Sequence, residues 1–446
     1  KFEQLIREAA DSRITLPAIH AMEEFLATAD RKNPGLDRVE LPVVSTDSPA
    51  VILFTSGTTG FSKGVVLSHS NLIGDVQAII DTDVIRSDDN FHLILPLHHT
   101  YSSTANLLGA LALGARATFA TSYKSRDLVD DIRLAGITTL VGVPLVFENI
   151  MIGIRRSIAD APALKRTLFR LLYGISAAGS LIRLSLGAAL FRSLREKAGL
   201  GSLRRMISGG AALRPEVNIF FERLGFSLLQ GYGLTETSPV LTVNRPGRNR
   251  IGSVGTPLPG VELKIDDPDD NGVGEICARG PMIMQGYFEN PAATSEVLRD
   301  GWFHTGDAGF LDRHGALHIT GRLKNVIVTG GGKNVYPEEI EARLDLSPFI
   351  LESLVVSISR KRGGGEELAA LIVPQYTFIK QESERGHMMD VHQEIKTVVE
   401  AYNHSVPAYR RLRQWRIQEQ EFDKTSTRKI RRYLYKDVFK LADAAK

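Results

Sequence analysis

The stretch Thr55-Ser56-Gly57-Thr58-Thr59-Gly60-Phe61-Ser62-Lys63-Gly64 determines how the rest of the chain is interpreted. It follows a short apolar run at residues 51–54, which predicts a strand leading into a glycine-rich loop. Glycines let backbone N–H groups approach an anion, hydroxyl groups add donors, and Lys63 adds a positive charge. The loop therefore predicts phosphate binding, although not by a Walker A loop, whose spacing is absent. The alternative is a polar hairpin without a ligand.

Composition limits the possible classes of protein. A chain of 446 residues with 43% hydrophobic and 24% charged residues is typical of a globular protein with two or three domains. The net charge of +3 gives no indication of nucleic-acid binding. The single cysteine, Cys277, excludes an intramolecular disulfide, and no Cys/His cluster has the spacing of a zinc site. The first residues lack the apolar core of a signal peptide, so we expect a cytoplasmic protein.

The order of apolar patterns predicts an α/β fold. Strand-like runs at 91–95, 117–119 and 138–141 alternate with helical periodicity at 71–80, where Ser70 is the expected cap, and at 127–135. This alternation predicts mainly parallel sheets in a large domain at 51–320, after two helices and a linker at 1–50. Short β-type runs between turns at 252–318 predict an antiparallel or barrel-like portion, and residues 325–446 predict a small α+β domain.

A second motif, Gln230-Gly231-Tyr232-Gly233-Leu234-Thr235-Glu236-Thr237, follows another strand-like run. A tyrosine between glycines presents an aromatic face with open space beside it, which suits stacking on a nucleotide base. Thr235 can donate to a phosphate, and Glu236 offers a hard oxygen ligand for Mg²⁺. The alternative is a turn with an ordinary packed tyrosine.

These motifs resemble those of the adenylate-forming superfamily, which includes acyl-CoA synthetases, luciferases and peptide-synthetase adenylation domains. The first stretch is similar to the family's T-S-G-T-T-G-x-P-K-G, with Ser62 in place of proline, and the second matches G-Y-G-x-T-E completely. Gly301-Trp302-Phe303-His304-Thr305-Gly306-Asp307 matches G-W-x-x-T-G-D, and the resemblance extends from Val51 to Lys429. Residues 142–148 and the helical insert after them resemble the long-chain fatty-acid–CoA ligases in particular.

The resemblance implies a role for each matching residue. It implies ATP or AMP contacts from Thr55, Ser56, Gly57, Thr58, Thr59, Gly60, Lys63, Gly209, Gly210, Ala211, Gln230, Gly231, Tyr232, Gly233, Thr235, Asp307, Arg322 and Lys429. It implies catalytic roles for Lys429, Glu236, Thr235, His99 and Lys63, and Mg²⁺ binding by Thr58 and Glu236. Gly330, Gly331 and Gly332 would border the CoA thiol, and Lys324 would lie at a hinge, residues 321–324, about which the small domain moves.

Two of these matches are imperfect. In the segment Leu95-Pro96-Leu97-His98-His99-Thr100, His99 aligns with the family's histidine near the acyl pocket, and His98 replaces an aromatic residue. Around Lys429, Asp423 replaces the proline of the family's motif and Arg428 replaces its glycine. Arg428 could therefore stiffen the loop or contact phosphate. For the basic residues that follow, Arg431 and Arg432, the alternative is that they lie on a solvated face.

The reaction implied is the activation of a medium- or long-chain fatty acid by ATP and Mg²⁺, followed by transfer to CoA. An acyl-carrier-protein ligase shares these motifs, and Arg410, Arg411, Arg413 and Arg416 could meet an acidic carrier. A different hypothesis is a fragment, or a module of a larger fusion, with little turnover, because only about fifty residues precede the first motif. We expect no nucleic-acid partner, and the oligomeric state stays open.

One segment, residues 168–191, is rich in Leu, Ile, Ala and Gly and is flanked by basic residues, with no acidic residue between Asp160 and Glu196. A membrane-spanning helix is not expected, because Arg170, Arg183 and three glycines interrupt it. The segment predicts either a basic amphipathic helix for peripheral contact with an anionic membrane or an internal helix pair with a solvated basic face.

Overall fold

The structure is a computed structural model, and it describes residues 43–55, 62–122, 124–181, 184–359, 366–384, 390–424, 430–435 and 437–439. The chain divides into two compact units, Lys1–Ser45 and Thr46–Lys446, and the account below concerns the second. The two helices expected near the N-terminus lie outside the described residues. Among the described helices, none is both long and apolar enough to span a bilayer.

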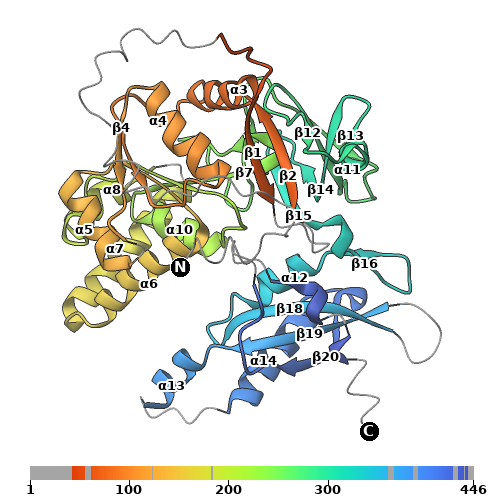
Figure 1. Cartoon of the computed structure of the whole chain (residues 1–446). Helices are drawn as coiled ribbons and strands as arrows, with labels where there is room; N and C mark the ends of the chain where they lie inside the picture. The colour runs from red at the N-terminus through yellow and green to blue at the C-terminus, as the bar shows by residue number, and fades with distance from the viewer. Residues whose placement is uncertain are drawn as a thin grey trace, which may run out of the picture. The chain divides into compact units, whose positions relative to one another are not determined.

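A seven-stranded sheet forms the centre of the large domain (Figure 1). Its strands, in spatial order, are β4 (Arg116–Phe119), β3 (Asn90–Leu93), β5 (Thr139–Gly142), β6 (Arg205–Ser208), β7 (Ser227–Gly233), β8 (Val240–Val243) and β9 (Thr256–Pro257). The first five are parallel, and the last two pair antiparallel. All residues of β3, β5 and β6 are buried, as expected for parallel strands covered on both faces. The predicted α/β class is confirmed.

Helices cover both faces of this sheet. They are α3 (His69–Ile80), the π-helix η2 (Tyr101–Leu108), α4 (Gly109–Ala112), α5 (Ser125–Ala135), α6 (Pro144–Ala159), α7 (Ala163–Leu181), α8 (Gly187–Leu190), α9 (Arg192–Lys197) and α10 (Pro215–Arg223). Helices α6, α7 and α10 pack together beside the sheet (Figure 1). Their core includes Phe147, Met206 and Phe221, whereas Phe91, Val141 and Leu229 belong to the core on the other face.

The predicted cap of α3 was wrong by two residues. The helix begins at His69, so Ser70 is already helical and the cap is Ser68. The Ser68 hydroxyl accepts from the Asn71 N–H at 3.1 Å, and the Asn71 side chain accepts from the Ser68 N–H at 2.9 Å. This reciprocal pair satisfies two backbone donors, which a serine inside the first turn cannot do.

The antiparallel part of the large domain consists of two sheets. One holds β1 (Pro49–Thr55), β2 (Lys63–Ser68) and β12 (Gly286–Tyr287), and pairs Thr55 with Lys63 on either side of the glycine-rich loop. The other holds β10 (Glu262–Asp266), β11 (Gly274–Arg279), β14 (Trp302–Leu311) and β13 (Leu298–Arg299), and β15 (Leu317–Arg322) also pairs with β14. Helix α11 (Pro291–Val297) connects β12 and β13.

The elements after the turn η4 (Leu323–Asn325) form an α+β arrangement with a core of its own, which includes Ile340, Val355 and Val399. They are β16 (Ile327–Val328), β17 (Asn334–Val335), α12 (Pro337–Leu344), β18 (Ile350–Ser359), β19 (Glu366–Pro374), α13 (Tyr376–Glu384), α14 (Val391–His404) and β20 (Leu412–Ile417), followed by the turn η6 (Arg432–Tyr435). Strand β19 pairs antiparallel with β18 and parallel with β20.

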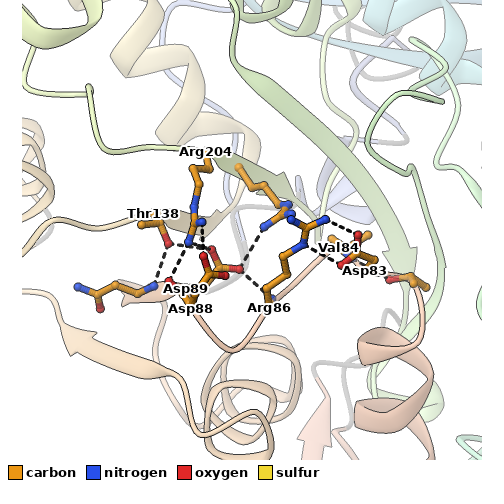
Figure 2. A network of polar contacts seen from close by, with 10 residues as sticks. Asp83, Val84, Arg86, Asp88, Asp89, Thr138 and Arg204 are labelled. Atoms are coloured by element: carbon orange, nitrogen blue, oxygen red, sulfur yellow. Dashed lines mark hydrogen bonds and ion pairs between the residues drawn. The ribbon is translucent and has the colours of Figure 1, made fainter.

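A buried carboxylate ties three parallel strands together at their N-terminal ends (Figure 2). Asp89, just before β3, accepts from the Arg86 N–H at 2.8 Å, the Thr138 hydroxyl at 2.8 Å and Arg204 Nη2 at 2.9 Å. Arg205 Nη1 lies 3.2 Å from the same carboxylate. Thr138 precedes β5, Arg204 precedes β6, and Arg205 is the first residue of β6. The Asp89 side chain is fully buried, so it depends on these donors.

We predict that Asp89→Asn lowers the free energy of unfolding by about 3–5 kcal/mol, because it leaves the nearly buried Arg205 without its charge partner. The matched control is Asp88→Asn, since Asp88 also contacts Arg204 but is 65% exposed. The control should change stability little. Equal urea-denaturation curves for the two variants would contradict the assigned role of Asp89.

Candidate functional site

Two of the predicted nucleotide motifs lie at the carboxyl edge of the central sheet. Ser208 ends β6 and leads into Gly209 and Gly210, and Tyr232 lies at the end of the neighbouring parallel strand β7. Parallel strands bring their carboxyl ends to one edge, where open α/β sheets bind ligands. Gln230 is buried in β7, whereas Gly210 and Ala211 are exposed. The fold thus brings together two segments that are about twenty residues apart in the sequence.

Tyr232, Asp307 and Arg322 form one polar group. The Tyr232 hydroxyl donates to Asp307 Oδ2 at 2.8 Å, and Arg322 Nε lies 2.6 Å from Asp307 Oδ1. Burial, and next the Asp307 charge, raise the pKa of Tyr232 well above its usual value, so the phenol stays protonated and donates. The strand register places Asp307 directly opposite Arg322. Three residues for which nucleotide contacts are predicted from separate motifs therefore lie in one connected arrangement.

Glu236 and Lys63 are connected through a residue that the sequence analysis missed. The Tyr287 hydroxyl donates to Glu236 Oε1 at 3.0 Å, and Lys63 Nζ lies 4.7 Å from the centre of the Tyr287 ring. Tyr287 reaches this position because β12 pairs with β2, which begins at Lys63. It lies 51 residues from Glu236 in the sequence, so no local spacing indicates it. Thr235, beside Glu236, begins the short turn η3 (Thr235–Thr237).

The glycines of these motifs permit close approach of other groups. A Cβ at Gly233 would lie 1.7 Å from the Pro239 carbonyl oxygen, so no other residue fits there without backbone movement. A Cβ at Gly209 would lie 2.8 Å from the Tyr101 ring, whose hydroxyl donates to the Ile207 carbonyl at 3.2 Å. At Gly231 the nearest atom would be the Thr242 carbonyl oxygen, at 3.1 Å. Tyr101, which the sequence analysis also missed, therefore lies directly against the Gly209 segment.

His99 follows β3, and its ring centre lies 4.2 Å from that of His98. Burial lowers the pKa of His99, and the neighbouring His98 lowers it further. His99 is therefore neutral near pH 7 and able to accept or donate one hydrogen bond. The predicted preference for His99 over His98 stays a prediction.

The predicted thiol-side loop is the tip of the β16–β17 hairpin. The Thr329 N–H donates to the Lys333 carbonyl at 3.0 Å, and the Gly332 N–H donates to the Thr329 carbonyl at 2.8 Å. Gly332 has φ of +73°, so it needs the conformational freedom of glycine. A Cβ at Gly331 would meet nothing within 4 Å, and Gly330 is exposed. Lys324, the predicted hinge, lies in the turn η4.

Some predicted residues lie outside the described part of the chain. They are Ser56, Gly57, Thr58, Thr59, Gly60 and Lys429, so their proposed roles stay predictions. Lys424 and Ile430, which flank residues 425–429, are described. Lys424 Nζ lies 2.8 Å from Glu352 Oε2, a bridge pairs Lys424 with Ile430, and the Arg431 N–H donates to the Asp423 carbonyl at 2.8 Å.

The interpretation of Arg432 as part of a solvated face was wrong. Its side chain is only 21% exposed and forms ion pairs with Glu341 of α12 and, at 3.6 Å, with Glu338. Glu341 also accepts from the Val355 N–H at 2.7 Å, and Glu338 accepts from Asn325 in the turn η4 at 2.6 Å. Basic composition alone could not distinguish a buried cation from a solvated one, because the acidic partners lie about ninety residues away.

Comparison with known proteins identifies the family. A model described as "AMP-binding enzyme" matches residues 3–288, and one described as "AMP-binding enzyme C-terminal domain" matches residues 324–441. The chain belongs to the AMP-binding enzyme family. The predicted membership of the adenylate-forming superfamily is thereby confirmed.

Among curated relatives, a long-chain-fatty-acid–[acyl-carrier-protein] ligase of Arabidopsis thaliana is 31% identical over 93% of this chain and 59% of its own length. A long-chain-fatty-acid–CoA ligase of Mycobacterium bovis is 32% identical over 78% of this chain and 62% of its own length. The chain thus spans about three-fifths of the length of these relatives. The ATP-bound crystal structure of MatB from Rhodopseudomonas palustris is 27% identical, with a TM-score of 0.69 over 90% of this chain and 70% of that one.

The ion pairs of Arg432, which lies after residues 425–429, generate a prediction. Arg432→Met removes the ion pairs to Glu341 and Glu338, so the segment that begins at Ile430 should separate from α12 more often. We expect faster hydrogen exchange in peptides that contain Arg431, whose N–H bonds to Asp423. The control is Arg413→Met, an exposed arginine of β20, which should leave this exchange unchanged. Identical exchange in both variants would show that Arg432 does not hold the segment.

Proposed function

We propose that this chain uses ATP to activate a medium- or long-chain fatty acid as an acyl-adenylate and then transfers the acyl group to CoA. In the first step the carboxylate attacks the α-phosphorus and pyrophosphate leaves. In the second step the thiol displaces AMP and a thioester forms. The observation that carries the proposal is the connected group Tyr232–Asp307–Arg322 at the carboxyl edge of the sheet. Family membership and the two fatty-acid ligases named above support the reaction and the substrate class.

The proposed roles follow from the chemistry of each group. Asp307 is a buried carboxylate whose oxygens can accept from ribose hydroxyls while they hold Tyr232 and Arg322. Tyr232 presents its ring to adenine, and Lys63, with Lys429, neutralises phosphate and carboxylate charge. Glu236 is a partly exposed carboxylate with one oxygen held by Tyr287, which fits a hard-oxygen ligand for Mg²⁺ together with Thr58. Bound Mg²⁺ would add positive charge at the phosphates.

A second candidate acceptor is an acyl carrier protein instead of CoA. The Arabidopsis relative that spans 93% of this chain is named for that acceptor. Arg411 and Arg413 are exposed at the start of β20 and could attract an acidic carrier. Arg410, by contrast, forms an ion pair with Glu339, so it is less available for a partner.

The proposed activity is tested by ATP–pyrophosphate exchange in the presence of short-, medium- and long-chain acids. We expect exchange that depends on a medium- or long-chain acid and on Mg²⁺, and thioester formation when CoA or carrier protein is added. Comparison of the two acceptors distinguishes a CoA ligase from a carrier-protein ligase. Nucleotide binding without acid-dependent exchange would instead support a binding module of a larger protein.

The geometry of the hairpin tip generates a prediction about the thiol. If Gly331 borders the path of the pantetheine arm, Gly331→Leu should form acyl-AMP and pyrophosphate normally but release at least tenfold less thioester. The variant should also melt normally, because a Cβ at Gly331 meets no atom within 4 Å and φ at Gly331 is not left-handed. Both products are measured in single turnovers.

Gly332→Leu is the matched comparison, since its φ of +73° makes the substitution strained whatever the ligand. It should lower the melting temperature. If Gly331→Leu reduces pyrophosphate and thioester equally, the loop has a structural role and does not line a thiol path.

We also propose that α7 contacts an anionic membrane surface. Leu164, Leu168, Leu171 and Ile175 recur at helical spacing and are 82%, 51%, 61% and 42% exposed. Lys165, Arg166 and Arg170 are exposed on the same helix, which contains no acidic residue. An exposed apolar stripe beside basic side chains suits the interface of an anionic bilayer, while other residues of α7 pack against α6 and α10.

We predict that the protein co-sediments with vesicles that contain phosphatidylserine and binds far less to pure phosphatidylcholine vesicles. Leu168→Glu with Leu171→Glu should reduce binding at least fivefold, because it removes apolar area and adds negative charge. Leu134→Glu is the control, as Leu134 is 79% exposed but lies on α5. Equal loss of binding in the control, or no binding by the unaltered protein, would overturn the assignment.

A further inference from the structure

Three neighbouring antiparallel strands bring four potential metal ligands together. Asp266 of β10 is paired with Glu275 of β11, and Cys277 of β11 is paired with His304 of β14. Glu275 and Cys277 are two residues apart in one strand, so their side chains share a face of the sheet. One ligand atom from each of the four residues lies within 4.8 Å of every other.

The cluster is compact, and three of its four side chains are largely buried, whereas Asp266 is 44% exposed. His304 Nδ1 lies 3.3 Å from Cys277 Sγ and 2.7 Å from Glu275 Oε2. Cys277 is fully buried, and the side chains of His304 and Glu275 are 9% and 18% exposed. Ligands around a tetrahedral zinc ion lie about 3.3–3.8 Å apart, given metal–ligand bonds of about 2.0–2.3 Å. The three side chains therefore need to separate by less than about 1 Å to admit an ion.

Two cations from neighbouring positions face the cluster. Arg299 Nη2, on β13, lies 2.8 Å from His304 Nδ1 and 3.7 Å from Glu275 Oε2. Lys264 Nζ, on β10, lies 3.0 Å from Asp266 Oδ1. Both side chains are substantially exposed, at 52% for Arg299 and 38% for Lys264, so either can turn toward solvent. Arg299 is a guanidinium that contacts an imidazole nitrogen and a carboxylate, which are groups that a metal ion would also use.

We propose that Cys277, His304 and Glu275 bind a zinc ion, with Asp266 as the fourth ligand and Arg299 displaced into solvent. A thiolate, an imidazole and carboxylates form a ligand set that favours zinc over Mg²⁺ or Ca²⁺, which prefer oxygen alone. Binding replaces the thiol proton of Cys277, which leaves to solvent. Four ligands from the protein make the site closed and structural, so no bound water is available for catalysis.

The zinc site would stabilise β14, the strand that carries Asp307. Glu275 Oε1 accepts from the Gly306 N–H at 3.1 Å, and the Thr305 hydroxyl donates to the Ile276 carbonyl at 2.7 Å. His304, Thr305 and Gly306 lead directly to Asp307 along β14. A zinc ion bound to β10, β11 and β14 would therefore restrict the movement of the residues that position the Asp307 carboxylate. Zinc binding itself does not depend on the proposed ligase activity.

The single cysteine of the sequence makes the test specific. Chelator-treated protein is titrated with Co²⁺, a spectroscopic substitute for zinc, and then with Zn²⁺ as competitor. We expect one equivalent of Co²⁺ to produce a near-ultraviolet thiolate-to-cobalt absorption band, which can arise only from Cys277. Zinc should abolish this band, protect the thiol from a chromogenic disulfide reagent and raise the melting temperature, whereas Mg²⁺ should do none of these.

Variants separate a zinc site from an ion-pair cluster. Cys277→Ser should remove the band, and His304→Gln should weaken metal binding at least a hundredfold. Arg299→Gln should strengthen binding severalfold, because Arg299 competes for His304 and Glu275, and its half-exposed position should preserve the fold. If neither the unaltered protein nor Arg299→Gln gives a thiolate band or zinc-dependent thiol protection, the cluster is an Arg299 ion-pair site and the proposal is wrong.

Discussion

The ion pair between Asp307 and Arg322 determines where the proposed nucleotide site lies. It joins opposite residues of β14 and β15 at 2.6 Å, immediately before the turn that leads into the small domain. The same carboxylate accepts from Tyr232, which ends a strand of the central sheet. Because side chains alternate along a strand, a shift of one residue in this pairing would turn Asp307 away from Tyr232. The register of one hairpin thus connects the parallel sheet, the antiparallel sheet and the turn η4.

The partners of Asp307 also fix the orientation of its carboxylate. Asp307 is almost fully buried, and its two partners are a neutral phenol and a guanidinium. A buried carboxylate with fixed partners is held in one orientation, so its remaining acceptor positions point in defined directions. Such preorganisation lowers the cost of binding a ligand with two adjacent hydroxyl groups. Lys63, Tyr287 and Glu236 form a second connected group, which lies on the phosphate side of our proposal.

The sequence predicted the parts of the fold that depend on local pattern. Apolar runs located β3, β4 and β5, and the glycine-bordered Tyr232 motif indicated a strand end, because these signals lie within a few residues. It placed the cap of α3 at Ser70 instead of Ser68, because both serines are competent caps and only the chain path selects one. Contacts between distant segments could not be predicted: Tyr287 reaches Glu236, and Arg432 reaches Glu341, through strand pairing and packing alone. For the same reason Cys277 and His304, 27 residues apart, showed no metal-site spacing.

The claim at the centre of this account is that Asp307, held by Arg322 and Tyr232, binds the ribose of a nucleotide. It is tested most directly by equilibrium binding of ATP and of 2′,3′-dideoxy-ATP to the unaltered protein and to Asp307→Asn. We predict that the unaltered protein binds ATP at least tenfold more tightly than the dideoxy analogue, and that the variant loses most of this preference. An equal preference in both proteins, or none in the unaltered one, would show that Asp307 does not contact the ribose.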